Sequence, residues 1–164
     1  MMQKKVQIIS DGSLDLSQEL TKEKDIEVVP FYVSFDSETY QKEMVEVGVR
    51  EFYQEMVDHP TVFPKTSMPS VHDYYEVFEK HAKEKMPVIC ICITRKFSGS
   101  LQSATTAKDM ILEEYPDAQI TVIDSTVNTV LQGLYVLEAC RLRDMGLEYQ
   151  QIVDALLPIR ETGR

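Results

Sequence analysis

The chain has 164 residues, of which 43% are hydrophobic and 27% are charged. This length and balance are typical of one soluble globular domain, and no apolar run reaches the about 20 residues needed to cross a membrane. Seventeen basic against 27 acidic side chains give a formal net charge of −10, which disfavours a nucleic-acid partner. The first residues lack the pattern of a signal peptide, so we expect a cytoplasmic protein.

Strand and helix patterns alternate along the first part of the chain. The predicted elements are a strand at 6–10, a helix at 14–24, a strand at 26–35 and a helix at 49–57. Pro30 marks an irregularity or an edge in the second strand, because proline cannot donate to a sheet ladder. The connection 36–47 is polar and has room for a short strand. His59-Pro60 ends the last of these helices, since the residue before a proline disfavours the helical region.

The rest of the chain continues the alternation. A loop at 63–70 leads through Ser70 and Asp73, a capping pair, into the next helix. The elements predicted after it are a strand at 87–93, a helix at 101–115, a strand at 119–123 and helices at 129–145 and 147–159. Cys90 and Cys92 alternate with isoleucines, as small apolar residues of a buried strand do. The pattern predicts an α/β fold with three layers, α/β/α, around a mostly parallel sheet.

Hydroxyl side chains follow three of the predicted strands. These are Ser10 with Ser13, then Thr94, Ser98 and Ser100, and finally Ser125 with Thr126. Ligands of open α/β sheets bind beyond the carboxyl ends of the strands, where hydroxyls and helix-opening N–H groups can bind an anion. Gly99 would let the backbone approach such a ligand, and the Thr66-Ser67 loop joins the site if it folds over the same edge. The simpler interpretation is that Ser98 and Ser70 only cap helices.

Catalysis has less support in the sequence. An activated serine needs a neighbouring base, yet His59, His72 and His81 lie away from the strand ends, where we expect them to be solvated. Asp11 and Asp124 do follow strands, but aspartate at such a turn more often bonds backbone N–H groups. The sequence has no phosphate loop, no glycine-rich dinucleotide motif and no zinc-binding spacing, so we predict no cofactor or metal and no enzymatic activity.

Three segments together resemble the N-terminal domain of the DegV family of bacterial fatty-acid-binding proteins. They are Lys65-Thr66-Ser67-Met68-Pro69-Ser70, the stretch 93–104 around Thr94-Arg95-Lys96-Phe97-Ser98-Gly99-Ser100, and Val122-Ile123-Asp124-Ser125. The resemblance covers nearly the whole chain. It departs from the family at Thr94 and Ser100, where the family usually has Ser and Thr, respectively, so that both hydroxyls are kept. It also departs at Leu131, which replaces a glycine and is expected to reshape the acyl tunnel.

The resemblance implies a lipid-binding protein that holds the carboxylate of a long-chain fatty acid and presents it to a separate fatty acid kinase. It implies ligand contacts from Thr66, Ser67, Ser98, Gly99, Ser100 and Ser125. It further implies a DegV-like N-terminal α/β domain at 1–160, with 161–164 as the start of a linker to a second domain that this sequence lacks.

Two alternatives use the same edge of the sheet. One is a phosphocarrier or small hydrolase, which would want a histidine at a strand end. The other is an interaction module that has no ligand, because side chains fill its crevice.

Overall fold

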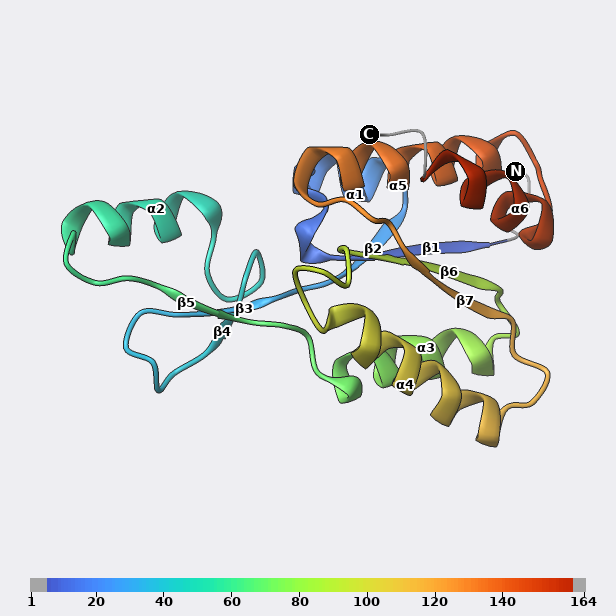
Figure 1. Cartoon of the computed structure of the whole chain (residues 1–164), viewed down its shortest axis with the longest axis horizontal. Helices are drawn as coiled ribbons and strands as arrows, with labels where there is room; N and C mark the ends of the chain where they lie inside the picture. The colour runs from blue at the N-terminus through green and yellow to red at the C-terminus, as the bar shows by residue number, and fades with distance from the viewer. Residues whose placement is uncertain (1–5, 161–164) are drawn as a thin grey trace.

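The computed structural model describes residues 6–160, which form a parallel sheet between two layers of helices (Figure 1). The strands are β2, β1, β6 and β7, in that order across the sheet, and all neighbours are parallel. Their bounds are Ile26–Val29, Gln7–Asp11, Val88–Cys92 and Ile120–Asp124, respectively. The predicted three-layer α/β/α fold is therefore confirmed.

Helices cover both faces of this sheet (Figure 1). One face carries α1 (Gln18–Glu23), α5 (Thr129–Asp144) and α6 (Tyr149–Ile159), and the other carries α3 (Val71–Lys83) and α4 (Ser100–Glu114). No described helix is long and apolar enough to cross a membrane.

The central strand β6 shows why both layers form. Its five residues are all buried. Ile89 and Ile91 pack against the α5 and α6 side, whereas Cys90 and Cys92 pack against the α3 and α4 side with Tyr74. Because alternate side chains of a strand point to opposite faces, one apolar run serves two cores. The cysteines are free and buried, as predicted.

A second, smaller sheet extends from the side of this body, together with α2 (Val49–Asp58) (Figure 1). It is antiparallel, in the order β4 (Gln41–Lys42), β3 (Tyr32–Ser34) and β5 (Lys65–Ser67). The predicted strand at 26–35 is thus two strands in different sheets, divided at Pro30 and Phe31. The segment 65–67, predicted as a loop, is a strand because it pairs with β3.

One other element differs from prediction. The helix expected at 14–24 is a short 3-10 turn (Gly12–Leu14) followed by α1, which Ser17 caps by accepting from the Leu20 N–H. Ser70 and Asp73 form the predicted capping box of α3. The predicted linker start at 161–164 lies outside the described residues.

Candidate functional site

The carboxyl ends of β1, β6 and β7 meet at one edge of the parallel sheet. From β1 the chain continues to β2 on one side of the sheet, whereas β6 and β7 are added on the other side of β1. Ligands of open α/β sheets bind at such a switch point between neighbouring strands. Backbone bonds join the ends of β6 and β7, from Ser125 N to Cys92 O at 3.0 Å and from Thr94 N to Val127 O at 3.0 Å. The predicted hydroxyl segments 94–100 and 125–126 therefore lie at the same edge.

Asp11, the last residue of β1, accepts four hydrogen bonds at this edge. Its Oδ2 accepts from Ile93 N at 2.9 Å and from Ser100 Oγ at 2.8 Å. Its Oδ1 accepts from Gln132 Nε2 at 2.8 Å and from Ser13 N at 3.3 Å. Burial raises the pKa of Asp11, and the bonds from Gln132, Ile93, Ser100 and Ser13 oppose that rise. The carboxylate therefore ties β1 to β6, α4 and α5.

Ser100 is fully buried, and its hydroxyl is used inside the protein. It donates to Asp11 and lies 2.6 Å from the hydroxyl of Tyr74. Burial raises the pKa of Tyr74 well above its ordinary value of 10.0, so Tyr74 stays protonated and can donate to Ser100. Ser100 thus fixes the first turn of α4 rather than presenting its hydroxyl outward.

Ser98 and Gly99 form the turn that opens α4. The Ser98 Oγ accepts from Ser100 N at 3.1 Å, which is the capping role of the simpler interpretation. Its side chain is only half-buried, and an accepting hydroxyl keeps its own hydrogen for another partner. A methyl group built on Gly99 would lie 2.6 Å from the Met68 sulfur, so the small residue at 99 lets Met68 lie directly against this turn.

Thr66 and Ser67 lie in the small sheet, next to a residue that contacts the Ser98-Gly99 turn. Both belong to β5, are exposed, and directly precede Met68. Ser67 pairs with Tyr32 of β3, and Thr66 pairs with Val33. Met68 therefore joins two segments that are 30 residues apart in numbering, the end of β5 and the Ser98-Gly99 turn.

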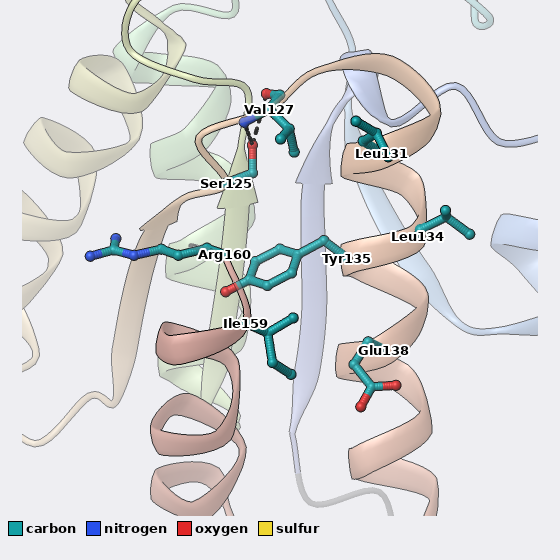
Figure 2. A pocket seen from close by; sticks show the side chains of 8 residues that line it. All are labelled: Ser125, Val127, Leu131, Leu134, Tyr135, Glu138, Ile159 and Arg160. Carbon is teal, nitrogen blue, oxygen red and sulfur yellow. Dashed lines mark hydrogen bonds between the residues drawn. The ribbon is translucent and has the colours of Figure 1, made fainter. Parts of the chain in front are cut away.

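Ser125, like Ser100, is buried. It is 1% exposed, its hydroxyl donates to Val127 O at 3.0 Å, and the same oxygen accepts from Val127 N at 3.3 Å. Ser125 thus stabilises its own turn. It also borders a pocket of about 230 Å³ whose lining is largely apolar (Figure 2). The other lining residues come from the segment before α5, from α5 itself and from the C-terminal end of α6: Val127, Leu131, Leu134, Tyr135, Glu138, Ile159 and Arg160.

The local charge at the edge differs from that of the whole chain. Arg95 and Lys96 are exposed in the turn before Ser98, and Arg95 lies 3.7 Å from Asp124. The N-terminus of α4 adds partial positive charge. The edge thus carries basic groups beside the acidic Asp11 and Asp124, whereas the whole chain has a net charge of −10.

The sequence did not reveal two buried polar residues. Gln132 is fully buried and donates to Ser10 Oγ and Asp11, but its place inside a helix gave no sign of this. His81 was expected to be solvated, and this is wrong. It is 4% exposed and lies 2.6 Å from Glu27 Oε2, because the end of α3 packs beside β2.

Comparison with known sequences places these features in a family. The DegV family model, described as "Uncharacterised protein, DegV family", matches residues 5–163. A DegV domain-containing protein of Clostridium acetobutylicum is 33% identical over 153 residues, which cover 93% of this chain and 53% of that protein. The chain therefore spans about half the length of such relatives.

Solved structures of related proteins share this fold, and two of them are more than 25% identical to this chain in sequence. A protein from Eubacterium ventriosum, described as binding stearic acid, has a TM-score of 0.88 and 46% identity, covering 92% of this chain and 52% of its own. A DegV family protein from Thermus thermophilus, described by its fatty acid binding, has a TM-score of 0.79 and 28% identity, covering 96% of this chain and 54% of its own.

Proposed function

Because this chain belongs to the DegV family, we propose that it binds a long-chain fatty acid and holds the carboxylate between the end of β5 and the Ser98-Gly99 turn. The observation that carries this proposal is the contact of Met68, the residue after β5, with Gly99. The fatty acid binding described for the Eubacterium ventriosum and Thermus thermophilus proteins supports the choice of ligand.

The two β5 hydroxyls take different parts in this proposal. Side chains of directly paired residues lie on one face of a sheet, and successive residues alternate. Ser67 therefore lies on the same face of the small sheet as its partner Tyr32. Thr66 lies on the opposite face, and by the same alternation Met68 lies on the face of Thr66. Thr66 and Ser98 donate to the carboxylate, together with N–H groups at the start of α4. Ser100 and Ser125 stabilise the surrounding segments through their internal bonds.

The acyl chain extends in this proposal toward the apolar pocket beside Leu131. That pocket has about 230 Å³, whereas ligand pockets usually have about 300–1,000 Å³, so it takes only part of a long tail. Each buried methylene contributes about 0.8 kcal/mol, so the tail supplies most of the affinity and the hydroxyls supply orientation. In this proposal residues 1–160 are the N-terminal α/β domain. A second domain, corresponding to the part of the relatives that this chain does not cover, forms the rest of the tunnel.

Presentation of the bound acid to a fatty acid kinase is the finer part of the proposal. Phosphoryl transfer then takes place on the kinase, and this chain binds and orients. The placement of the histidines agrees with this division: His59, His72 and His81 each lie beside a glutamate, at Glu55, Glu76 and Glu27, rather than at the strand ends where a phosphocarrier would need one.

Organic extraction of the purified protein and mass spectrometry test the ligand class, with long-chain fatty acids as the expected result. Displacement of a fluorescent fatty-acid analogue by stearic acid tests the headgroup residues. Thr66→Ala and Ser98→Ala should each weaken binding by about tenfold or more, because a hydrogen bond to a charged group contributes about 1.5–3 kcal/mol.

The controls for this assay are Ser67→Ala and Thr106→Ala, which remove hydroxyls from the opposite face of β5 and from the far part of α4. Both should bind like the unaltered protein. Unchanged affinity of a Thr66→Ala, Ser98→Ala double variant would refute the headgroup assignment.

A further inference from the structure

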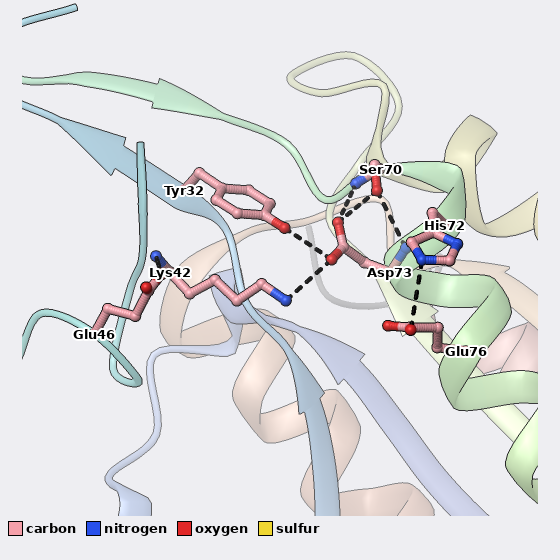
Figure 3. Close-up of polar contacts among 7 residues, drawn as sticks. All are labelled: Tyr32, Lys42, Glu46, Ser70, His72, Asp73 and Glu76. Atoms are coloured by element: carbon pink, nitrogen blue, oxygen red, sulfur yellow. Dashed lines mark hydrogen bonds and ion pairs between the residues drawn. The ribbon is translucent and has the colours of Figure 1, made fainter. Parts of the chain in front are cut away.

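Asp73 joins the small sheet to the main body through one buried carboxylate (Figure 3). It is the third residue of α3 and only 9% exposed. Its Oδ1 accepts from the Tyr32 hydroxyl at 2.8 Å and lies 3.2 Å from Lys42 Nζ. Its Oδ2 accepts from Ser70 N at 2.8 Å and from Ser70 Oγ at 2.6 Å. We call Asp73 with Tyr32, Lys42 and Ser70 the Asp73 clamp.

The clamp lies on both sides of the segment that carries the proposed headgroup contact. Tyr32 pairs with Lys42 across β3 and β4 and with Ser67 across β3 and β5, so these three residues form one rung of the small sheet. Only Met68 and Pro69 separate Ser67 from Ser70, the other anchor of the clamp. Met68 and Pro69 therefore belong to a closed ring, which the Asp73 carboxylate completes between Ser70 and Tyr32.

The charges of the clamp strengthen this ring. Burial raises the pKa of Asp73, but the bonds from Ser70, Tyr32 and Lys42 outweigh it and leave that pKa below its ordinary value. The bond to Asp73 raises the pKa of Lys42. Both groups are thus charged at neutral pH, and hydrogen bonds between ionised partners are the stronger ones.

We infer that Asp73 is a positioning residue, which through Tyr32 and Lys42 holds β5 so that Thr66 faces the Ser98-Gly99 turn. This inference rests on the proposed function, because it assigns the clamp to the same headgroup site. It adds that residues with no ligand contact set how well a carboxylate is recognised.

The variant that tests this is Tyr32→Phe, which removes one bond of the clamp and leaves the Ser70 cap of α3 intact. Tyr75→Phe is the matched control, because the Tyr75 hydroxyl donates to Glu114 Oε1 at 2.8 Å. It removes the same kind of bond from the same helix, at a place away from β5. Lys42→Met is a second variant that removes the charged partner alone.

Two measurements separate positioning from a loss of stability. The first is amide hydrogen exchange of residues 65–67, which should become faster in Tyr32→Phe and in Lys42→Met but not in Tyr75→Phe. The second is affinity for stearic acid compared with octadecan-1-ol, which has the same tail but no carboxylate. Tyr32→Phe should weaken binding of the acid by about three- to tenfold and leave binding of the alcohol unchanged.

The outcomes are distinct. Unchanged exchange at 65–67 in both clamp variants overturns the inference, and so does equal weakening of acid and alcohol. If the unaltered protein binds neither compound, the proposed function fails, while the exchange comparison still decides whether the clamp holds β5.

Discussion

Asp11 and Asp73 are buried carboxylates that join elements distant in the sequence. Asp11 bonds to Ser100 and Gln132, which lie 89 and 121 residues further along the chain. Asp73 bonds to Tyr32, 41 residues before it. A buried carboxylate is costly unless donors surround it, and each of these two receives several. Asp11 ends a strand and Asp73 caps a helix, so each has a local role, and each also bonds to an element far away in the sequence.

Asp11→Asn should lower the free energy of unfolding by about 2–3 kcal/mol. The amide would turn one donor toward Ile93 N or Gln132 Nε2 and leave a buried donor unsatisfied. Asp124→Asn is the control, because Asp124 also ends a strand, β7, and accepts from Thr126 N at 2.9 Å, a bond that the amide oxygen of asparagine can keep. Urea denaturation measures both variants. Equal losses would contradict the central role given to Asp11.

The Asp73 clamp should make stability depend on acid pH. The folded-state pKa of Asp73 is lowered from 3.8, so its contribution is fully present above that value and is lost as the pH falls through the lower folded-state pKa. The free energy of unfolding should therefore drop more steeply below about pH 4 in the unaltered protein than in Asp73→Asn. Thermal melts at a series of pH values measure this effect. If the melting temperatures of the two proteins fall equally with pH, ionisation of Asp73 does not contribute to stability.

Among the elements, α5 depends most on a close approach. A methyl group on Gly133 would lie 2.3 Å from the Leu14 carbonyl oxygen and 2.9 Å from Leu16 Cδ2. The glycine therefore lets α5 pack against the 3-10 turn that follows β1, which keeps Gln132 within reach of Asp11.

Gly133→Ala should destabilise the fold by about 1–3 kcal/mol, as overpacking does, although alanine favours an isolated helix by about 1 kcal/mol over glycine. Gly48→Ala is the control, since nothing lies within 4 Å of a methyl group there, and it should cost at most about 1 kcal/mol through cap preference. Chemical denaturation gives both values. A more stable Gly133→Ala protein would mean that helix propensity outweighs the contact.

The main elements could be predicted because their signals are local. The alternation of Cys90 and Cys92 with isoleucines predicts a buried strand, and Ser70 with Asp73 predicts a helix start; the structure confirms both. The small sheet could not be predicted in this way. Residues 65–67 carry no strand pattern and become β5 only because β3 lies beside them.

The location of the candidate site could be predicted from the sequence, but the hydrogen bonds of its individual side chains could not. Parallel strand ends had to share an edge, so the gathering of segments 94–100 and 125–126 followed from the fold class. The directions of the hydroxyls did not. Ser100 is turned inward by Asp11, which lies 89 residues earlier, and Ser125 bonds within its own turn. Thr66, Ser67, Ser98 and Gly99 remain the exposed or half-buried part of the predicted set.

At the scale of the molecule, the proposed headgroup site lies where two sheets meet. The parallel sheet supplies a rigid edge, and the small sheet supplies the end of β5, which Met68 and the clamp hold beside that edge. No described residue of α2 is buried, so we expect the small sheet to depend strongly on this junction. Ligand binding at the junction should therefore stabilise both parts together.

The most direct test is a titration of the ¹⁵N-labelled protein with stearic acid, followed through its backbone amide resonances. The account predicts the largest shifts at Thr66, Ser98 and Gly99 and at the first amides of α4, and it predicts that octadecan-1-ol leaves these resonances nearly unchanged. Shifts of equal size with both compounds, or shifts confined to the opposite edge of the sheet, would contradict recognition of a carboxylate at this site.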